Sequence, residues 1–223
     1  MELITVGTGS TGNCYLLHRD NDTYIALDCG CKWKNVMIKT KFSPTKIGFA
    51  LVTHSHGDHN GYARDFQKNC IKVYSPGNLV ERRKITIDGV DVIPFEVPHD
   101  VQCFAYLIRV NGRNIVYMTD FGYCKYTLKS WSIDTWLIAC NYVEAPDVND
   151  AKYAHVVRGH SSLKTVKDIL EINKTDALKN VILCHISDDG GHGDVERMKS
   201  EIQEVVGDGV QVTIAKKGAT INL

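Results

Sequence analysis

His54-Ser55-His56-Gly57-Asp58-His59 is the most informative stretch of the sequence. It places three imidazoles and one carboxylate within six residues, directly after the apolar strand predicted at 49–53. Packing alone does not explain this run, because each of these side chains would need its own polar partner if it were buried. In an extended segment His54 and His56 project to the same side, and after the turn that Gly57 permits, Asp58 and His59 can face a second position. The stretch therefore predicts ligands for two adjacent cations.

Three isolated residues could complete such a pair of sites. Each follows an apolar run with the composition of a buried strand: His99, Asp120 and His185. Side chains at the ends of strands in one sheet can converge, although any one of these residues alone would more often be a polar residue in a turn at the end of a strand. Imidazole nitrogen and carboxylate oxygen suit borderline-soft divalent metals, so we expect two ions, zinc by default, with manganese or iron as substitutes.

The pattern along the chain predicts one layered α/β domain over residues 1–223. Alternating or continuous apolar runs predict strands at 3–6, 14–18, 24–27, 49–53, 71–74, 90–97, 103–110, 114–118, 181–184 and 210–214. Helical periodicity follows two capping residues, Ser162 and Asp194.

Gly7-Thr8-Gly9-Ser10-Thr11-Gly12 matches the glycine pattern of dinucleotide-binding proteins. That motif requires a helix directly after it, whereas residues 13–17 have the composition of another strand. We therefore predict a tight turn here. A turn whose backbone N–H groups face a bound anion is the alternative.

Composition and charge limit the other possibilities. The 223 residues hold 26 Lys and Arg against 26 Asp and Glu, so no overall positive field attracts nucleic acid. The chain shows no apolar run of membrane-spanning length and no secretion signal at its start, and we expect a cytoplasmic protein with its eight cysteines reduced. Cys29-Gly30-Cys31 lacks a second pair at metal-binding spacing and is not favoured as a separate metal site.

The hexapeptide and the three strand-end residues resemble the metallo-β-lactamase superfamily. The resemblance spans essentially the whole chain and implies a four-layer αββα sandwich. It also implies how the ligands divide between the ions. One metal is held by His54, His56 and His99, a second by Asp58, His59 and His185, and Asp120 bridges both.

Shorter motifs resemble the YycJ/WalJ-like branch, a group of proposed metal-dependent exonucleases or phosphodiesterases. These motifs are Gly9-Ser10-Thr11-Gly12-Asn13-Cys14, Leu27-Asp28-Cys29-Gly30, His99-Asp100, Thr119-Asp120-Phe121-Gly122, Gly159-His160-Ser161-Ser162 and His185-Ile186-Ser187. The chain departs from the branch at Ala139-Cys140-Asn141, which lacks an acid, and at Asp188-Asp189-Gly190-Gly191.

The resemblance and the chemistry of the ligands favour hydrolysis of a phosphodiester, with a small diester or a nucleic-acid single strand as the substrate. We expect Asp58 to orient or deprotonate the attacking water and His160 to steady a phosphate oxygen or protonate the leaving group. Asp28 and Asp100 are expected to orient imidazoles, and Asn13 and Asn141 to supply hydrogen bonds. His18, His155 and His192 are expected to face solvent.

Two other functions stay open at this stage. The same metal site could hydrolyse carbon esters, thioesters or lactams. Alternatively, the chain could be a non-catalytic binding module that metal stabilises, an interpretation that the altered Ala139-Cys140-Asn141 stretch supports.

Overall fold

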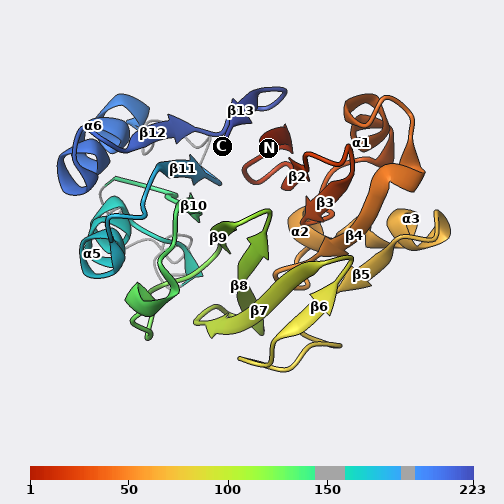
Figure 1. The fold of residues 1–223 in the computed structure, drawn as a ribbon, viewed down its shortest axis with the longest axis horizontal. Helices are drawn as coiled ribbons and strands as arrows, with labels where there is room; N and C mark the ends of the chain where they lie inside the picture. Colours follow the sequence, from red (N-terminus) through yellow and green to blue (C-terminus); the bar gives the residue numbers. More distant parts are fainter. Residues whose placement is uncertain (144–158, 187–193) are drawn as a thin grey trace, which may run out of the picture.

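The computed structural model describes residues 1–143, 159–186 and 194–223, and two mixed sheets form its centre (Figure 1). The first sheet has six strands in the order β13 (Thr220–Asn222), β1 (Glu2–Gly7), β2 (Cys14–His18), β3 (Tyr24–Leu27), β4 (Ile47–Leu51) and β5 (Lys72–Tyr74). The second has seven, in the order β12 (Gln211–Ile214), β11 (Asn180–Cys184), β10 (Thr135–Ala139), β9 (Arg113–Met118), β8 (Cys103–Val110), β7 (Val90–Val97) and β6 (Ile85–Ile87).

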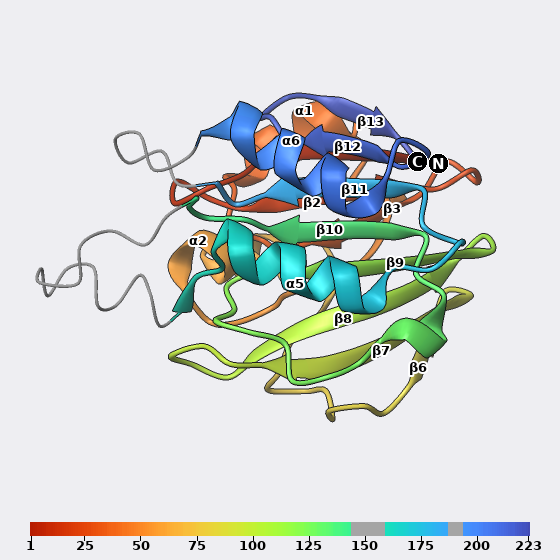
Figure 2. The same ribbon diagram turned by 90° about the vertical axis from the view of Figure 1, so that its left-hand side faces the viewer.

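Helices cover the outer face of each sheet, which gives four layers. On the first sheet lie α1 (Trp33–Lys39) and α3 (Ala63–Lys68), and on the second lie α5 (Leu163–Asn173) and α6 (Val195–Val206), as Figure 1 shows. The short α2 (Gly57–Asn60) lies at one end of the sandwich, and two 3₁₀ turns, η1 (Pro44–Lys46) and η2 (Lys129–Trp131), complete the elements (Figure 2). The expected αββα sandwich is confirmed.

The first sheet is buried on both faces, as the side chains of strand β2 show. These side chains alternate, as the two-residue period of a strand requires. Tyr15 and Leu17 pack into the core between the sheets, whereas Cys14 and Leu16 pack into a second core beneath α1 and α3. Val36 of α1 and Phe66 of α3 close that second core.

The two predicted helix caps form as expected. The Ser162 side chain accepts a hydrogen bond from the Thr165 N–H (3.0 Å) before α5, and the Asp194 side chain accepts one from the Arg197 N–H (2.9 Å) before α6. The predicted strand at 49–53 is wrong at both ends, because β4 runs from Ile47 to Leu51. The backbone has therefore already left the sheet when it reaches His54.

The glycine-rich stretch is a turn between β1 and β2, with no helix after it, so the dinucleotide-binding interpretation is excluded. Gly9 and Gly12 adopt φ angles of 87° and 136° there. Residues that have a Cβ rarely adopt such positive φ angles. Among the described residues no helix is both long and apolar enough to cross a membrane.

Candidate metal centre

Four strand ends carry the predicted ligands to one end of the sandwich. The hexapeptide follows β4, His99 follows β7, Asp120 follows β9 and His185 follows β11. His56 is the extended residue directly before α2 (φ −61°, ψ 150°), so the chain turns into the helix at Gly57. This turn separates the two imidazoles of the extended segment from Asp58 and His59, which belong to α2.

Three imidazoles form a first group around one point. His54 Nε2 lies 3.1 Å from His56 Nδ1, and His99 Nε2 lies 3.3 Å from the same Nδ1. One nitrogen from each ring lies within 4.8 Å of the other two, close enough for one ion to bind all three.

A second group lies beside the first. Asp58 Oδ2 lies 3.3 Å from His59 Nε2 and 3.5 Å from His185 Nε2, and the two imidazole nitrogens are 3.1 Å apart. The His59 and His185 rings are stacked, with centroids 5.1 Å apart and planes at 7°. These three residues form a second set of potential ligands for a cation.

Asp120 lies between the two groups. Its Oδ2 is 2.8 Å from His59 Nε2, 3.4 Å from His185 Nε2 and 4.0 Å from His54 Nε2, so one oxygen reaches both sets. Asp120, His185 and Asp28 all adopt positive φ angles (48°, 49° and 60°). Non-glycine residues rarely occupy this region, and such residues concentrate at functional sites.

The donor set fits divalent cations. Imidazole nitrogens from three strand ends lie close to one another and to carboxylate oxygens, and a cation is the group that satisfies such lone pairs together. Asp120 Oδ1 and His160 Nδ1 are buried and lie 3.1 Å apart, and neither has a further hydrogen-bond partner among the described residues. The Asp120 carboxylate therefore contacts imidazoles through both of its oxygens.

The protonation states also suit metal binding, which requires neutral imidazoles and ionised carboxylates. Burial lowers the pKa of His54 to about 2, helped by the neighbouring His59, and burial lowers the pKa of His99 as well. Although burial acts to raise the pKa of Asp120, the adjacent His185 and His59 hold that pKa well below its usual value. For Asp58 burial also acts to raise the pKa, but hydrogen bonds from His185 and His59 lower it.

His59 is the exception. Burial acts to lower its pKa, yet the carboxylates of Asp28 and Asp120 on either side raise the pKa well above its usual value. When no cation is bound, a proton on His59 therefore compensates the negative charge of Asp28 and Asp120.

Asp28 fixes the orientation of His59. The fully buried carboxylate accepts hydrogen bonds at Oδ1 from the Thr53 N–H (2.8 Å) and hydroxyl (3.0 Å). At Oδ2 it accepts one from the Tyr117 hydroxyl and lies 2.6 Å from His59 Nδ1. Since Nδ1 faces Asp28, His59 presents Nε2 to the metal pocket. The predicted role of Asp28 agrees with this geometry.

We expect Asp28→Asn to weaken binding of the second metal by roughly 10–100-fold, the usual cost of losing an outer partner of a metal-ligating histidine. An amide N–H₂ in place of Oδ2 would face His59 Nδ1 and favour the tautomer that carries its proton on Nε2. Equilibrium dialysis against zinc measures the change. The matched control is Asp134→Asn, which alters another buried carboxylate, bonded to Arg113 far from the site. Equal affinities in both variants would contradict this role.

Gly159 and two asparagines contact the rings of the predicted metal ligands. His99 Nδ1 lies 3.1 Å from the Gly159 carbonyl oxygen, and a Cβ at Gly159 would lie only 2.8 Å from this nitrogen. Asn141 Nδ2 lies 2.9 Å from His185 Nδ1 and donates to the His185 carbonyl oxygen (2.9 Å). Asn13 Nδ2 lies 3.0 Å from His59 Nε2. Both asparagines therefore reach the site.

Asp100 and His160 border the pocket. Asp100 Oδ1 lies 2.9 Å from His99 Nε2 and 3.4 Å from His56 Nε2, so it contacts two rings of the first group. His160 precedes the Ser162 cap and is half-buried beside Asp120. The pocket has a volume of about 230 Å³ and is lined by Ser10, His54, His56, Asp58, His99, Asp120, His160 and His185.

The structure thus brings together every residue that was predicted to bind metal, and their ligation stays a prediction. Sequence reasoning missed Thr53, Tyr117 and Gly159. One signal was available for Tyr117, because a tyrosine within an apolar strand needs a partner for its hydroxyl when it is buried. Cys29 and Cys31 are free thiols and belong to no potential metal group in the described ranges.

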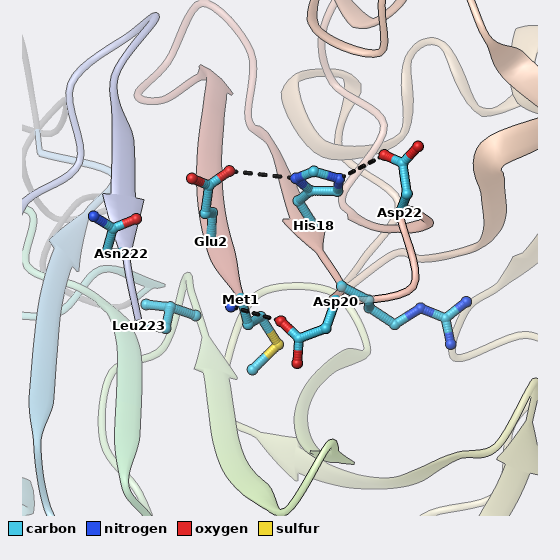
Figure 3. A pocket seen from close by; sticks show the side chains of 8 residues that line it. Met1, Glu2, His18, Asp20, Asp22, Asn222 and Leu223 are labelled. Carbon is cyan, nitrogen blue, oxygen red and sulfur yellow. Dashed lines mark hydrogen bonds and ion pairs between the residues drawn. The ribbon is translucent and has the colours of Figure 1, made fainter.

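His18 was expected to face solvent, and its side chain is partly exposed (26%). Its ring lies between two carboxylates, with Nδ1 3.3 Å from Glu2 and Nε2 3.0 Å from Asp22 (Figure 3), and it stacks on Tyr24. Glu2, His18 and Asp22 line a cavity of about 480 Å³. The β1–β2 register pairs Glu2 with His18 and Gly7 with Cys14, so this cavity lies at the end of the hairpin away from the metal centre. His155, His192 and residues 188–191 lie outside the described residues.

Comparison with known proteins identifies the fold. The model of the metallo-β-lactamase superfamily matches residues 7–82, a range that includes the hexapeptide. None of the curated proteins matches the sequence. The chain is thus similar to the superfamily over residues 7–82, and the narrower YycJ/WalJ-like resemblance is not confirmed.

Similar solved structures cover nearly the whole chain. The metallo-β-lactamase fold protein YhfI from Bacillus subtilis is 17% identical, with a TM-score of 0.73 and 98% of each chain covered. Zn²⁺-bound PqqB from Methylobacterium extorquens is 13% identical, with a TM-score of 0.73 and 100% of each chain covered. The short form of human tRNase Z is 15% identical, with a TM-score of 0.67, covering 100% of this chain and 99% of its own. The chain has the metallo-β-lactamase fold.

Proposed function

We propose that this chain is a metal-dependent hydrolase that binds two divalent cations, zinc by default, and cleaves phosphodiesters. The observation that carries the proposal is the pair of ligand groups that share Asp120 Oδ2, since a carboxylate between two sets of imidazoles is suited to hold two ions side by side. Manganese or iron could replace zinc in a site of this composition.

Each side chain has a task that its position supports. Cations held by these residues would supply Lewis acidity, which polarises a phosphoryl oxygen and lowers the pKa of a water molecule. Asp58 presents its carboxylate to the pocket, where it can accept a proton from the attacking water. His160 lines the pocket beside Asp120 and can donate a hydrogen bond to a phosphate oxygen or a proton to the leaving group.

The similar structures support parts of the proposal. The name of human tRNase Z states a nuclease that acts on transfer RNA, and PqqB was solved with zinc. A small phosphodiester or a nucleic-acid single strand is therefore the proposed class of substrate.

One observation favours a second candidate. The lining of the metal pocket in the described part of the chain includes neither lysine nor arginine. A phosphate would thus depend on the cations alone for charge neutralisation, whereas a neutral carbon ester, thioester or lactam would not need it. Hydrolysis of such substrates at the same site is the alternative.

The test is hydrolysis by the metal-loaded protein of bis(p-nitrophenyl) phosphate and of a panel of thioesters and lactams. We expect turnover of the phosphodiester, and we expect Asp58→Ala to reduce kcat by roughly 10²–10⁴-fold, the usual contribution of a positioned acid or base. Asp65→Ala is the matched control, because Asp65 is a neighbouring carboxylate on α3 that lies outside the pocket lining. Turnover of thioesters alone would establish the second candidate instead.

A further inference from the structure

The metal pocket is too small to enclose a whole diester. Its volume is about 230 Å³, whereas pockets that enclose small-molecule ligands usually measure roughly 300–1,000 Å³. The phosphate group and its immediate oxygens fit at the metal centre. At least one of the two groups that the phosphate joins must therefore extend into neighbouring space.

A larger cavity adjoins the metal pocket at His99. It measures about 520 Å³, and its lining consists of Glu96, Val97, Pro98, His99, Asp100, Val101, Gln102, Tyr123 and Lys125. His99 lines both spaces. A substrate whose phosphate lies at the metal centre can thus place one substituent past His99 into this cavity.

Tyr123 is the aromatic residue that this cavity offers to a ligand. It is 57% exposed, although large hydrophobic side chains in the described residues are mostly buried. It follows Asp120 by three residues, and the Gly122 N–H donates a hydrogen bond to the Pro98 carbonyl oxygen (3.0 Å). This bond fixes the segment that carries Tyr123 beside the segment that carries His99. The backbone that carries the exposed ring is therefore held beside the backbone that carries a predicted metal ligand.

The charges around the cavity do not suit a second phosphate. Its lining carries the carboxylates of Glu96 and Asp100 against the single ammonium group of Lys125. Lys125 is already compensated, since its Nζ lies 3.4 Å from a Glu96 oxygen and 3.9 Å from a Glu81 oxygen. The further phosphates of a strand would meet net negative charge here, whereas an uncharged aromatic ring can stack on Tyr123.

We propose that this cavity is a base subsite, in which Tyr123 stacks on the nucleobase of a small nucleotide diester whose phosphate lies at the metal centre. The inference rests on the proposed phosphodiesterase function and narrows its substrate. Of the two proposed substrate classes, it favours the small diester and not the nucleic-acid single strand.

Two esters that release the same p-nitrophenolate test the subsite. One is the p-nitrophenyl ester of thymidine 5′-monophosphate, which carries a base, and the other is methyl p-nitrophenyl phosphate, which does not. We expect Tyr123→Ala to raise KM for the thymidine ester roughly ten-fold, the scale of stacking between a base and an aromatic side chain. KM for the methyl ester should not change, and Tyr123→Phe should restore the wild-type value for the thymidine ester.

Phe42→Ala is the matched control, because Phe42 is an exposed aromatic residue (70%) outside both pocket linings. An equal effect of Tyr123→Ala on both esters would overturn the subsite while leaving phosphodiester hydrolysis established. Oligothymidylate cleaved with a higher kcat/KM than the thymidine ester would overturn the choice of a small diester.

A binding measurement keeps the inference testable if neither ester is hydrolysed, the outcome that contradicts the proposed function. Titration calorimetry on the zinc-loaded protein compares thymidine 5′-monophosphate with inorganic phosphate. We expect the nucleotide to bind more tightly, and Tyr123→Ala to remove the difference. Equal affinity of the wild-type protein for the two ligands would refute the base subsite.

Discussion

Asp120→Ala is expected to remove at least one metal ion per chain and to abolish hydrolysis. Asp120 Oδ2 lies between the two ligand groups, 2.8 Å from His59 Nε2 and 4.0 Å from His54 Nε2. Without it, the first group would consist of imidazoles alone, the second would keep only the carboxylate of Asp58, and no carboxylate would lie between the two cations. The loss of metal affinity should exceed the roughly 10–100-fold that follows from losing an outer partner of a ligand.

Plasma mass spectrometry of zinc in the purified variant, combined with the rate on bis(p-nitrophenyl) phosphate, measures this effect. Asp168→Ala is the control, because Asp168 is an exposed carboxylate on α5 paired with Lys164. If Asp120→Ala retained two ions per chain and the wild-type rate, Asp120 would not bridge the metals and the dinuclear assignment would be wrong.

Gly30→Ala is expected to have the second large effect, on stability as well as on metal binding. A Cβ at Gly30 would lie 1.7 Å from the Asp58 carbonyl oxygen and 2.8 Å from the Asn13 nitrogen, and neither backbone atom can move alone. The Asn13 N–H also donates to that same carbonyl oxygen (2.7 Å). The substitution must therefore displace α2 together with Asp58 and His59.

Overpacking of this kind usually costs roughly 1–3 kcal/mol. For a chain of this length each kcal/mol lowers Tm by roughly 2–4 °C. Differential scanning calorimetry, with and without zinc, measures both consequences, and the variant should gain less stability from zinc than the wild-type protein does. Gly209→Ala is the control, because no heavy atom lies within 4 Å of a Cβ there. A Gly30→Ala protein with wild-type Tm and zinc affinity would contradict the contact.

The potential metal ligands were predictable because local sequence restricts them strongly. The order of residues within the hexapeptide determines where its side chains lie. His54 and His56 precede the turn at Gly57, whereas Asp58 and His59 follow it. The distant ligands were found because apolar strands end directly before them, and strand ends of one sheet gather at one edge. The resemblance to a known superfamily then assigned each of these residues to an ion.

Contacts between segments far apart in the chain were not predictable. Tyr117 reaches Asp28 across 89 residues, and His99 packs on Gly159 across 60. No local pattern encodes either pair, because both depend on how distant strands and loops are arranged in space. The partner of His18 on the neighbouring strand, Glu2, which lies 16 residues away, was also left out. Helices α1 and α3 were missed because seven and six residues are too few for a clear helical period.

Anomalous diffraction at the zinc edge, from crystals of the zinc-loaded protein, tests the central claim most directly. We predict two peaks per chain, one among His54, His56 and His99 and the other among Asp58, His59 and His185, with Asp120 in contact with both. A single peak outside these two groups, or none, in crystals that contain zinc would contradict it.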